Sequence, residues 1–503
     1  MTSTTSTRRL SPLDGSFLRL DTQQSPMHVG WSAVFEAPSD DRPRPTVEAM
    51  RELAAGRVHE VPWCRWKLDG APFGLSEPRW IDDADFDLRA HIVQLTSPED
   101  PVSDATFESL RSTVLSTPLD RARPLWQVFL VPRLHDGRVG MIGKIHHALV
   151  DGLAALQIVK LFIDSEPDVR ARTPVRWHPS SRGGPAGWAL DAARYAVNDG
   201  LGALRAGSEA VTHPRSSVAA AARGARRIAT AVAEDVLPPA PASDLNGQIG
   251  PRRALTGYHA PRALLRAARG RGGTLNDVGL TAVAGALRTL ALRDGKAPEE
   301  PLKTMVPVSL RRLGEEGAGN QIAMVYMPLP VHLPTSGERL EFVREQTSLL
   351  KHADRPRNTQ AFVEAAGIVP PPLRTPVVRA LASSRQFNLT VSQSPAPRGA
   401  MYLLGCELEE VYSVVPIAQG HALAIGMVRY RNELFFGCYA DPVALPEVHE
   451  LPDLLRGELE ELAAAAAAQR GTATPAADAP AADLPTASNG HSRSNGRPLT
   501  PVG

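Results

Sequence analysis

KIHHALVDG, residues 144–152, is the stretch of the sequence that decides the fold. A strand is predicted just before it, over residues 139–145, and a helix just after it, over residues 153–163. The pair His146-His147 therefore stands at a junction between two regular elements, which fix the backbone on both sides. A histidine side chain has an unperturbed pKa of about 6.5, so it can accept a proton near neutral pH. The junction is therefore a good place for a catalytic base.

Two conformations are open for Asp151, which follows His147 by four residues. If the helix starts early, both side chains lie on one face; if the turn is tight, Asp151 points back into the protein and holds the loop. Gly152 suits a turn that needs a positive φ or a close backbone approach. The two adjacent histidines also have two simpler interpretations, the capped end of a strand and a metal site. The His-His-x-x-x-Asp spacing differs from the His-x-x-x-His spacing of a helical zinc site, and no Cys pair accompanies it, so we predict no metal.

Length and composition limit the class of protein. A chain of 503 residues is too long for one core, and 43% hydrophobic and 22% charged residues are ordinary for a globular protein. The net charge of +1 gives no general reason to expect nucleic acid as a partner. Three cysteines form no CxxC pair, which favours a reducing, cytoplasmic setting. Neither a signal peptide nor an apolar run of about 18 residues is present, so we expect any contact with lipid to be peripheral.

Hydrophobic periodicity predicts the elements around the histidines. Strands 126–131 and 139–145 are expected to form a hairpin around Asp136-Gly137. Further strands are predicted over residues 31–35, 61–68, 305–311, 322–328, 420–425, 427–431 and 434–439, and helices over residues 47–57, 107–116, 186–206, 217–236, 274–290, 338–351 and 452–468. Residues 388–397 are interpreted as a loop.

The pattern His146-His147-x-x-x-Asp151-Gly152 resembles the HHxxxDG signature of the acyltransferase superfamily that includes chloramphenicol acetyltransferase and peptide-synthetase condensation domains. More closely, the chain resembles the bacterial wax ester synthase/diacylglycerol acyltransferase family. Blocks similar to those of the family follow in the same order along the chain: LSPLD at 10–14, PMHVG at 26–30, PLW at 124–126, ND at 276–277, PVS at 307–309 and NLTVS at 388–392. The resemblance spans about residues 10–462.

The resemblance implies an α/β (α+β) fold, in which two chloramphenicol-acetyltransferase-like subdomains enclose a central active-site channel. We place the N-terminal subdomain at residues 10–163 and the C-terminal subdomain at 252–470, with disordered ends at 1–9 and 471–503. Residues 164–251, rich in Pro, Gly, Arg and Ala, are interpreted as a helical crossover. Their two basic helical segments leave a second interpretation open, an amphipathic surface that contacts an anionic membrane or a lipid droplet.

The sequence indicates direct transfer rather than a covalent intermediate. No Gly-x-Ser-x-Gly elbow is present, no cysteine lies near the histidines, and no phosphate-binding Gly-Lys-Ser/Thr loop occurs. The resemblance implies that His147 deprotonates an alcohol, whose oxygen then attacks the thioester of an acyl-CoA. It also implies that His146 supports the base, and that Asp151 holds the loop, for which Arg65 is the partner we expect by position. Acyl-CoA is then a co-substrate, and no bound cofactor is expected.

The remaining site residues are also carried over from the resemblance. Substrate contacts are expected at Gly152, Asn276, Asp277, Ser309, Arg311, Asn388, Thr390 and Ser392, and structural support at Arg65, Pro124, Leu125 and Trp126. For Asn276 and Asp277 a helix-capping role is equally compatible with their position before a predicted helix. The chain departs from the family at four positions: Gly279, Thr281, Gln393 and Ala396, where the family usually has Val, Ala, Asn and Gly.

By resemblance the acceptor is diacylglycerol or a long-chain alcohol, and the sequence does not decide between them. Two other functions stay open: an acyl transfer or condensation with a different acceptor, and a non-catalytic lipid-binding paralogue. Intact His147 and Asp151 argue against the paralogue, and the altered segment at Gln393 and Ala396 argues mildly for it.

Overall fold

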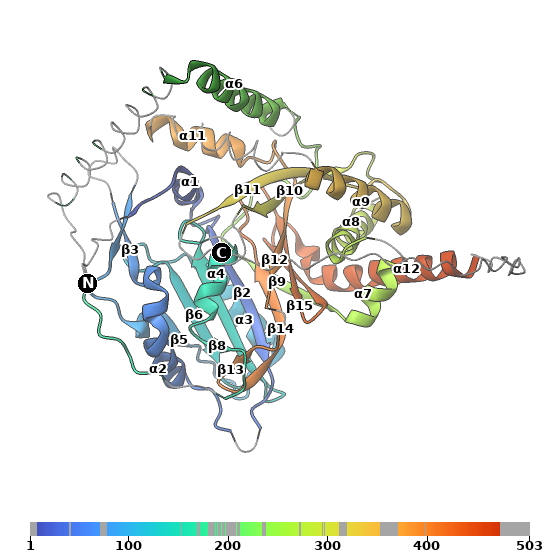
Figure 1. Ribbon diagram of the computed structural model, residues 1–503. Helices are drawn as coiled ribbons and strands as arrows, with labels where there is room; N and C mark the ends of the chain where they lie inside the picture. Colours follow the sequence, from blue (N-terminus) through green and yellow to red (C-terminus); the bar gives the residue numbers. More distant parts are fainter. Residues whose placement is uncertain are drawn as a thin grey trace, which may run out of the picture.

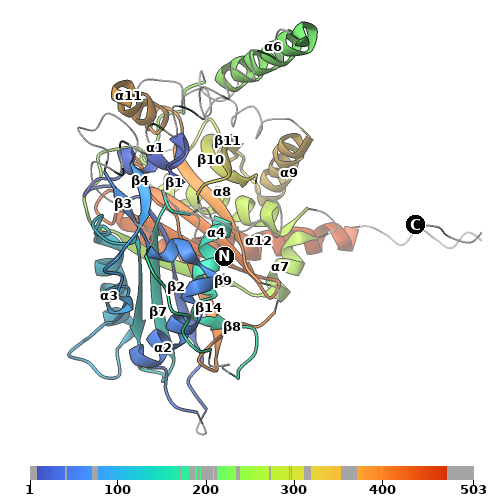
Figure 2. The same cartoon turned by 60° about the vertical axis from the view of Figure 1, so that its left-hand side comes forward.

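A computed structural model describes residues 8–472 of the chain, apart from residues 40–41, 71–77, 151, 169–171, most of 180–211, 234–237, 271–272, 294, 296, 311–318, 353–370 and 398. Its strands form a seven-stranded, a six-stranded and a three-stranded sheet. Figure 1 and Figure 2 show the two large sheets side by side, with most helices around them.

The first large sheet has the strand order β5-β6-β7-β2-β14-β13-β8. Its strands are β5 (Ile92–Gln94), β6 (Trp126–Val131), β7 (Val139–His146), β2 (His28–Phe35), β14 (Cys406–Val414), β13 (Tyr402–Leu403) and β8 (Ile163–Asp164). β13 and β14 come from the second half of the chain, so the N-terminal sheet is completed by C-terminal residues. The predicted hairpin is confirmed as β6 and β7, which pair antiparallel.

The second large sheet has the order β11-β10-β12-β15-β16-β9. Its strands are β11 (Ile322–Leu329), β10 (Leu302–Ser309), β12 (Leu389–Pro395), β15 (Leu423–Tyr430), β16 (Glu433–Ala440) and β9 (Ala254–Ala260). The small sheet contains β1 (Arg8–Arg9), β4 (Arg79–Asp82) and β3 (Trp66–Asp69). The result is a mixed α/β fold with two sheet-containing halves, as the resemblance implied.

The helices divide between the two large sheets and one end of the molecule. They are α1 (Pro12–Leu20), α2 (Val47–Arg57), α3 (Asp104–Ser116), α4 (Gly152–Val159), α6 (Pro214–Ala231), α7 (Arg262–Arg269), α8 (Leu275–Arg293), α9 (Ser336–His352), α11 (Pro371–Leu381) and α12 (Leu451–Thr472). In Figure 1, α7, α8, α9 and α12 gather beside the second sheet at the right, whereas α6 and α11 lie at the top. Within the described ranges, no helix combines the length and apolar character needed to cross a bilayer.

Three glycines aligned across the second sheet let β14 lie close to it. Gly257, Gly437 and Gly426 are direct neighbours on β9, β16 and β15. A Cβ at Gly437 would lie 2.5 Å from the carbonyl oxygen of Ser413, and one at Gly257 would lie 2.5 Å from the ring of Tyr412. Any side chain at these positions would push the two halves apart. The glycines therefore set the distance between the two walls of the site described below.

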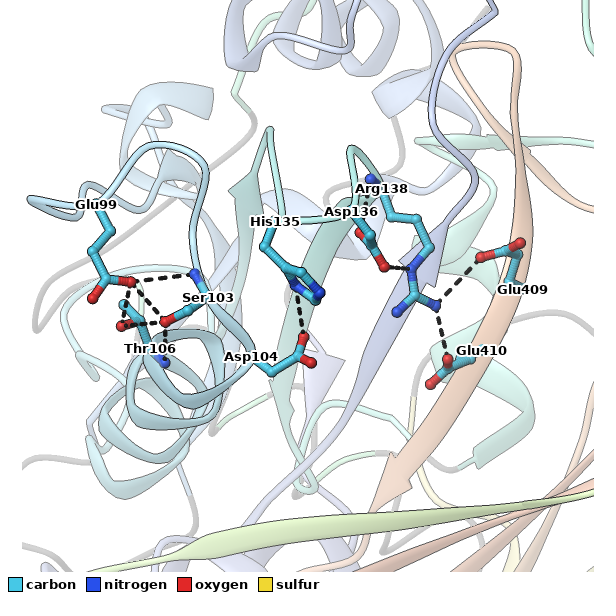
Figure 3. A network of polar contacts seen from close by, with 9 residues as sticks. All are labelled: Glu99, Ser103, Asp104, Thr106, His135, Asp136, Arg138, Glu409 and Glu410. Atoms are coloured by element: carbon cyan, nitrogen blue, oxygen red, sulfur yellow. Dashed lines mark hydrogen bonds and ion pairs between the residues drawn. The ribbon is translucent and has the colours of Figure 1, made fainter.

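A charged network holds β14 near its first residues, away from Tyr412 and Ser413 and away from the histidines. Figure 3 shows Arg138, the residue before β7, beside Asp136 of the hairpin turn and both Glu409 and Glu410 of β14. The Arg138 guanidinium is 2.9 Å from Glu410 and 3.4 Å from Glu409. This network ties the C-terminal strand to the N-terminal hairpin.

The helical layer explains two departures from the family. Gly279, where the family usually has Val, faces β15 so closely that a Cβ would lie 2.6 Å from Met427 Sδ. Thr281, where the family usually has Ala, is fully buried but donates its hydroxyl to the Asp277 carbonyl oxygen at 2.8 Å. Close packing therefore explains Gly279, and the hydroxyl of Thr281 is satisfied within its own helix.

Several predicted elements have different bounds in the structure. Residues 61–68 are not one strand: 3-10 turns cover Val58–Glu60 and Pro62–Arg65, and β3 begins only at Trp66. The alternation was misleading because Trp63, Cys64 and Arg65 are all buried in succession. In place of the two strands predicted over residues 420–425 and 427–431, the structure has the single strand β15, Leu423–Tyr430.

Two further boundaries near the histidines also differ. The predicted helix 153–163 ends at Val159, and Ile163 joins β8, where it pairs with Leu403. The segment interpreted as a loop is mostly the strand β12. Among described residues other than glycine, a positive φ occurs at Leu404, Arg431 and Asn432, and Ala396 does not share it. A missing glycine at Ala396 therefore causes no backbone strain.

Candidate active site

The backbone of His147 is held from both sides. β7 ends at His146, which pairs with His28 of β2. The His147 N–H donates to the carbonyl oxygen of Met27 at 2.8 Å, and its own carbonyl oxygen accepts a hydrogen bond from Asn320 Nδ2 at 2.6 Å. A tight turn follows, in which the Leu149 N–H donates to the His146 carbonyl oxygen at 3.0 Å. The turn between strand and helix is therefore fixed, as a catalytic base requires.

The His147 ring is oriented by Phe17 of α1. The two ring centroids are 3.9 Å apart and the ring planes differ by 4°. Phe17 itself is buried, so its ring cannot turn away without disturbing the core. This stack covers one face of the imidazole, and His147 lines the adjoining cavity.

His146 is buried and makes a different set of contacts. Its Nδ1 accepts the Ala148 N–H at 3.0 Å, which leaves the proton of the neutral ring on Nε2. Nε2 lies 3.6 Å from Asp21 Oδ2. Burial opposes ionisation of Asp21, but contacts with His146, the Met27 N–H and Arg121 outweigh it and hold the pKa of this carboxyl well below its usual range. These contacts fit the predicted supporting role of His146.

His28, opposite His146 on β2, is a buried neutral histidine. Burial, followed by the charge of Lys144, lowers its pKa to about 3. Lys144 is also buried, and its Nζ donates to the carbonyl oxygens of Val114 and Thr117 at the end of α3. Burial lowers the pKa of Lys144 to about 8. These contacts agree with the interpretation of His28 as structural.

An apolar cavity of about 160 Å³ adjoins His147. Alternate residues of β2 line it: Val29, Trp31, Ala33 and Phe35. The opposite wall comes from the second half of the chain and includes Pro307, Ile322, Ser392, Ser394 and Val428. Val29 pairs with Ile145, next to the histidines, and Phe35 pairs with Val139 at the other end of the two strands. The cavity therefore runs along β2 away from the histidines. It is a channel between the halves.

The structure brings only some of the predicted substrate residues to this channel. Ser392 lines it, and Thr390 lies two residues earlier on the same strand without lining it. Gly152 begins α4, next to the histidine turn. Ser309 is exposed at the end of β10. Asp151 and Arg311 lie outside the described residues, so their predicted roles stay predictions.

Asn388 and Asp277 both make hydrogen bonds within the protein, and their predicted substrate contacts stay predictions. Asn388 is fully buried; its side chain donates to the Pro241 carbonyl and to Asn246, and accepts the Lys303 N–H. Asp277 accepts the Thr274 N–H at 2.6 Å and the Thr347 hydroxyl at 2.8 Å, which caps α8 and ties it to α9.

Asn276 precedes Asp277 in the first turn of α8 and is half-buried. Neither residue lines the channel. Of the two roles weighed for this pair, the contacts of Asp277 support helix capping.

Pro124, Leu125 and Trp126 support the histidine turn. The Leu125 carbonyl oxygen accepts the His146 N–H at 2.9 Å, and the Pro124 carbonyl oxygen accepts the Trp126 N–H at 2.9 Å. Trp126 is fully buried and donates its Nε1–H to the Cys64 carbonyl oxygen at 2.7 Å.

Arg65 is buried too, and its guanidinium stacks on the Trp177 ring at 4.3 Å from the centroid. The expected pairing of Arg65 with Asp151 is not tested, because Asp151 is outside the described residues. Among the residues that the structure describes, no three His, Cys, Asp or Glu side chains come together as metal ligands.

Comparison with known proteins identifies the family. The model of the wax ester synthase/diacylglycerol acyltransferase catalytic domain matches residues 10–279, and that of the WS/DGAT C-terminal domain matches residues 318–463. The chain belongs to the wax ester synthase/diacylglycerol acyltransferase (WS/DGAT) family. A Mycobacterium tuberculosis relative, named "putative diacyglycerol O-acyltransferase", is 30% identical over 92% of both chains. Another from that organism, named "probable diacyglycerol O-acyltransferase tgs1", is 28% identical over 86% of this chain and 90% of its own.

Solved structures agree with the WS/DGAT fold. The wax ester synthase/diacylglycerol acyltransferase from Marinobacter aquaeolei VT8 matches with a TM-score of 0.64 at 24% identity, over 92% of this chain and all of that one. The starter condensation domain of rhizomide synthetase, solved in complex with C8-CoA and Leu-SNAC, matches with a TM-score of 0.56 at 16% identity, over 92% and 94% of the two chains. The predicted fold is thereby confirmed.

Sequence reasoning did not single out four residues that hold the histidines: Asp14, Phe17, Asp21 and Asn320. A signal was present for two of them, since Asp14 belongs to the LSPLD block and Asn320 follows the PVS block within a Gly-Asn pair. What the sequence does not show is that these distant segments meet at one turn.

Proposed function

We propose that this WS/DGAT protein transfers a long-chain acyl group from acyl-CoA to diacylglycerol, to a long-chain alcohol, or to both, with His147 as general base. One observation carries the proposal: His147 is fixed at the head of an apolar channel between the two halves, in an HHxxxDG sequence. An apolar channel suits a hydrocarbon chain, and a histidine at its head suits proton removal from a hydroxyl group.

The proposed reaction has two steps. His147 accepts the proton of the acceptor hydroxyl while the oxygen forms a bond to the thioester carbonyl carbon. The tetrahedral intermediate then loses its carbon–sulfur bond, and the proton passes from His147 to the leaving thiolate, which yields ester and free CoA. Neutral donors near the carbonyl would stabilise the oxyanion, and loss of one such donor typically raises the barrier by about 2.7–4 kcal/mol. Ser392 and Ser394 carry hydroxyl groups on the channel wall and are suitable donors.

The names of the relatives support an acyl-CoA donor and a diacylglycerol acceptor. The curated relatives are named diacylglycerol O-acyltransferases, and the Marinobacter protein is named for both reactions. The condensation-domain match was solved with an acyl-CoA, C8-CoA. These names concern other proteins, so a direct assay has to decide the acceptor for this chain.

We further propose that the end of the molecule formed by α6 and α11 contacts an anionic lipid surface. Arg215, Arg223 and Arg226 of α6 are exposed, and the helix sequence contains no acidic residue. Val218 on the same helix is 69% exposed. Such a basic, partly apolar helix is attracted to anionic lipid headgroups. Replacing the three arginines by glutamine should abolish co-sedimentation with phosphatidylserine vesicles and leave weak binding to phosphatidylcholine vesicles unchanged.

The test of the acyl-transfer proposal is CoA release from palmitoyl-CoA by purified protein, with dioleoylglycerol or hexadecanol as acceptor and the lipid products resolved. Triacylglycerol or wax ester as product would support the proposal and name the acceptor. If folded protein released no CoA with either acceptor, the alternatives of a different acceptor or a non-catalytic paralogue would be favoured.

A further inference from the structure

Two side chains from distant parts of the sequence hold the carbonyl group of His147. Asn320 lies just before β11, and Asp14 lies in the first turn of α1. Asn320 Nδ2 is 2.7 Å from Asp14 Oδ1 and 2.6 Å from the His147 carbonyl oxygen. Both neighbours are hydrogen-bond acceptors, so this end of the amide must be the NH₂ group. Each of its two hydrogens therefore has one acceptor.

Asp14 is itself held rigidly. Its side chain is 3% exposed, and a capping box with Ser11 orients it: the Asp14 N–H donates to Ser11 Oγ at 3.0 Å, and the Ser11 N–H reaches Asp14 Oδ2 at 3.4 Å. The Asn320 backbone N–H also donates to Asp14 Oδ1, at 2.9 Å. Phe17, three residues after Asp14 on the same helix, stacks on the His147 ring. Helix α1 thus controls both the ring and, through Asn320, the carbonyl of His147.

Gly319 extends this contact to the rest of the turn. Its N–H donates to the Leu149 carbonyl oxygen at 3.0 Å, and it forms an isolated parallel bridge with Val150. Its φ is +90°, and a Cβ there would lie 3.2 Å from the Arg8 guanidinium and 3.3 Å from Asp14 Oδ2. Residues 319–320 of the second half therefore dock on the histidine turn of the first half, and a glycine is needed for them to do so.

We propose that Asn320, fixed by Asp14, is a positioning residue that sets the location of His147 relative to the second wall of the channel. The proposal rests on the function proposed above. Ile322, two residues after Asn320, is part of that wall, so the hydrogen bond to the His147 carbonyl links the base directly to the half that contains Pro307 and Ser392. A misplacement of about 1 Å at a reacting group can cost about 100-fold in rate.

The first test is Asn320→Ala. The expected result is a fall in kcat of about 100-fold, with the KM for palmitoyl-CoA changed by less than about threefold, because the variant misplaces the base without altering the apolar channel. Wild-type kcat in this variant would overturn the proposal. Asp14→Asn keeps an acceptor oxygen for both Asn320 donors and should lose less activity than Asn320→Ala.

A swapped double variant separates positioning from simple stabilisation. In Asp14→Asn/Asn320→Asp the two side chains can still hydrogen-bond to each other, but no donor remains for the His147 carbonyl oxygen. We expect the melting temperature to recover relative to Asn320→Asp, which sets two carboxylates against each other, while kcat stays as low as in Asn320→Ala. Recovery of both stability and kcat would show that the pair only joins the halves, and would refute a positioning role.

A crystal structure of Asn320→Ala gives a result that does not depend on turnover. The expected outcome is a displaced turn at residues 146–150 and a disturbed stack between Phe17 and His147. An unchanged turn would overturn the proposal even if the wild-type protein had no acyltransferase activity. Absence of wild-type CoA release together with a displaced turn would instead refute the proposed function and leave the role of Asn320 intact.

Discussion

Ala33 lies partway along the channel, and a larger side chain there should shorten the acyl chain that the enzyme accepts. Ala33 lines the channel beside Met141 and Val411, its partners on the neighbouring strands. Ala33 comes four residues after Val29, and Phe35 comes six residues after it. At about 3.3 Å per residue, Ala33 lies about 13 Å and Phe35 about 20 Å from Val29 along β2. An extended alkyl chain advances about 1.25 Å per carbon from its bond length and angle. About ten carbons therefore reach Ala33, and about sixteen reach Phe35.

The variant Ala33→Phe should exclude about six methylene groups of a palmitoyl chain. At about 0.8 kcal/mol per buried methylene, complete exclusion would cost about 5 kcal/mol of binding free energy. Even half of that, about 2.5 kcal/mol, is a change of about 70-fold in kcat/KM. The cost should fall on palmitoyl-CoA and largely spare decanoyl-CoA, whose ten carbons reach no further than position 33.

The assay is CoA release with decanoyl-CoA and palmitoyl-CoA, and the quantity compared is the ratio of the two kcat/KM values. Ala33→Gly is the matched control, because it leaves the channel open and should leave the ratio near that of the wild type. Phe35→Leu, at the far end, should favour chains longer than palmitoyl. If Ala33→Phe lowers both kcat/KM values equally in a folded protein, the acyl chain does not run along β2.

Two stability predictions follow from buried groups. Gly285→Ala should lower the free energy of unfolding, measured in urea, by about 3 kcal/mol. The new Cβ would collide with the carboxylate of Glu458, which forms a buried ion pair with Arg339 at 2.6 Å. An unchanged urea midpoint would contradict this packing. His28, with its pKa lowered to about 3 in the fold against about 6.5 when unfolded, contributes stability that is present above pH 6.5 and lost as the pH falls. Between about pH 7.5 and 5 the wild type should lose about 2 kcal/mol more than His28→Gln, and equal losses would mean that His28 is not buried neutral near Lys144.

The local pattern of the sequence was enough to predict the elements that carry the histidines. Residues 126–131 and 139–145 alternate around an Asp-Gly turn, and the structure confirms the hairpin. The family resemblance added the two-halved fold, because ordered motif blocks identify a fold that periodicity alone leaves open. The substrate roles carried over to single residues stay predictions: the side chains of Asn388 and Asp277 make hydrogen bonds within the protein, and neither residue lines the channel.

Contacts between distant segments could not be predicted from the sequence. The close approach of β14 to the second sheet depends on three glycines on three strands, and no local signal shows that they align. Asp14 and Asn320 are 306 residues apart, and each looks like an ordinary capping or turn residue by itself. In the sequence Phe17 is one apolar residue near Leu18 and Leu20, and only its packing shows that it orients His147.

The most direct test of the account compares the wild type with His147→Ala in CoA release from palmitoyl-CoA with dioleoylglycerol or hexadecanol. Melting temperature and palmitoyl-CoA affinity are measured on the same preparations. The account predicts that His147→Ala binds palmitoyl-CoA with nearly wild-type affinity, keeps its fold and loses ester formation by at least about 100-fold, since general bases typically contribute 10²–10⁴-fold. Ester formation at the wild-type rate by His147→Ala would contradict the assignment of His147 as the base.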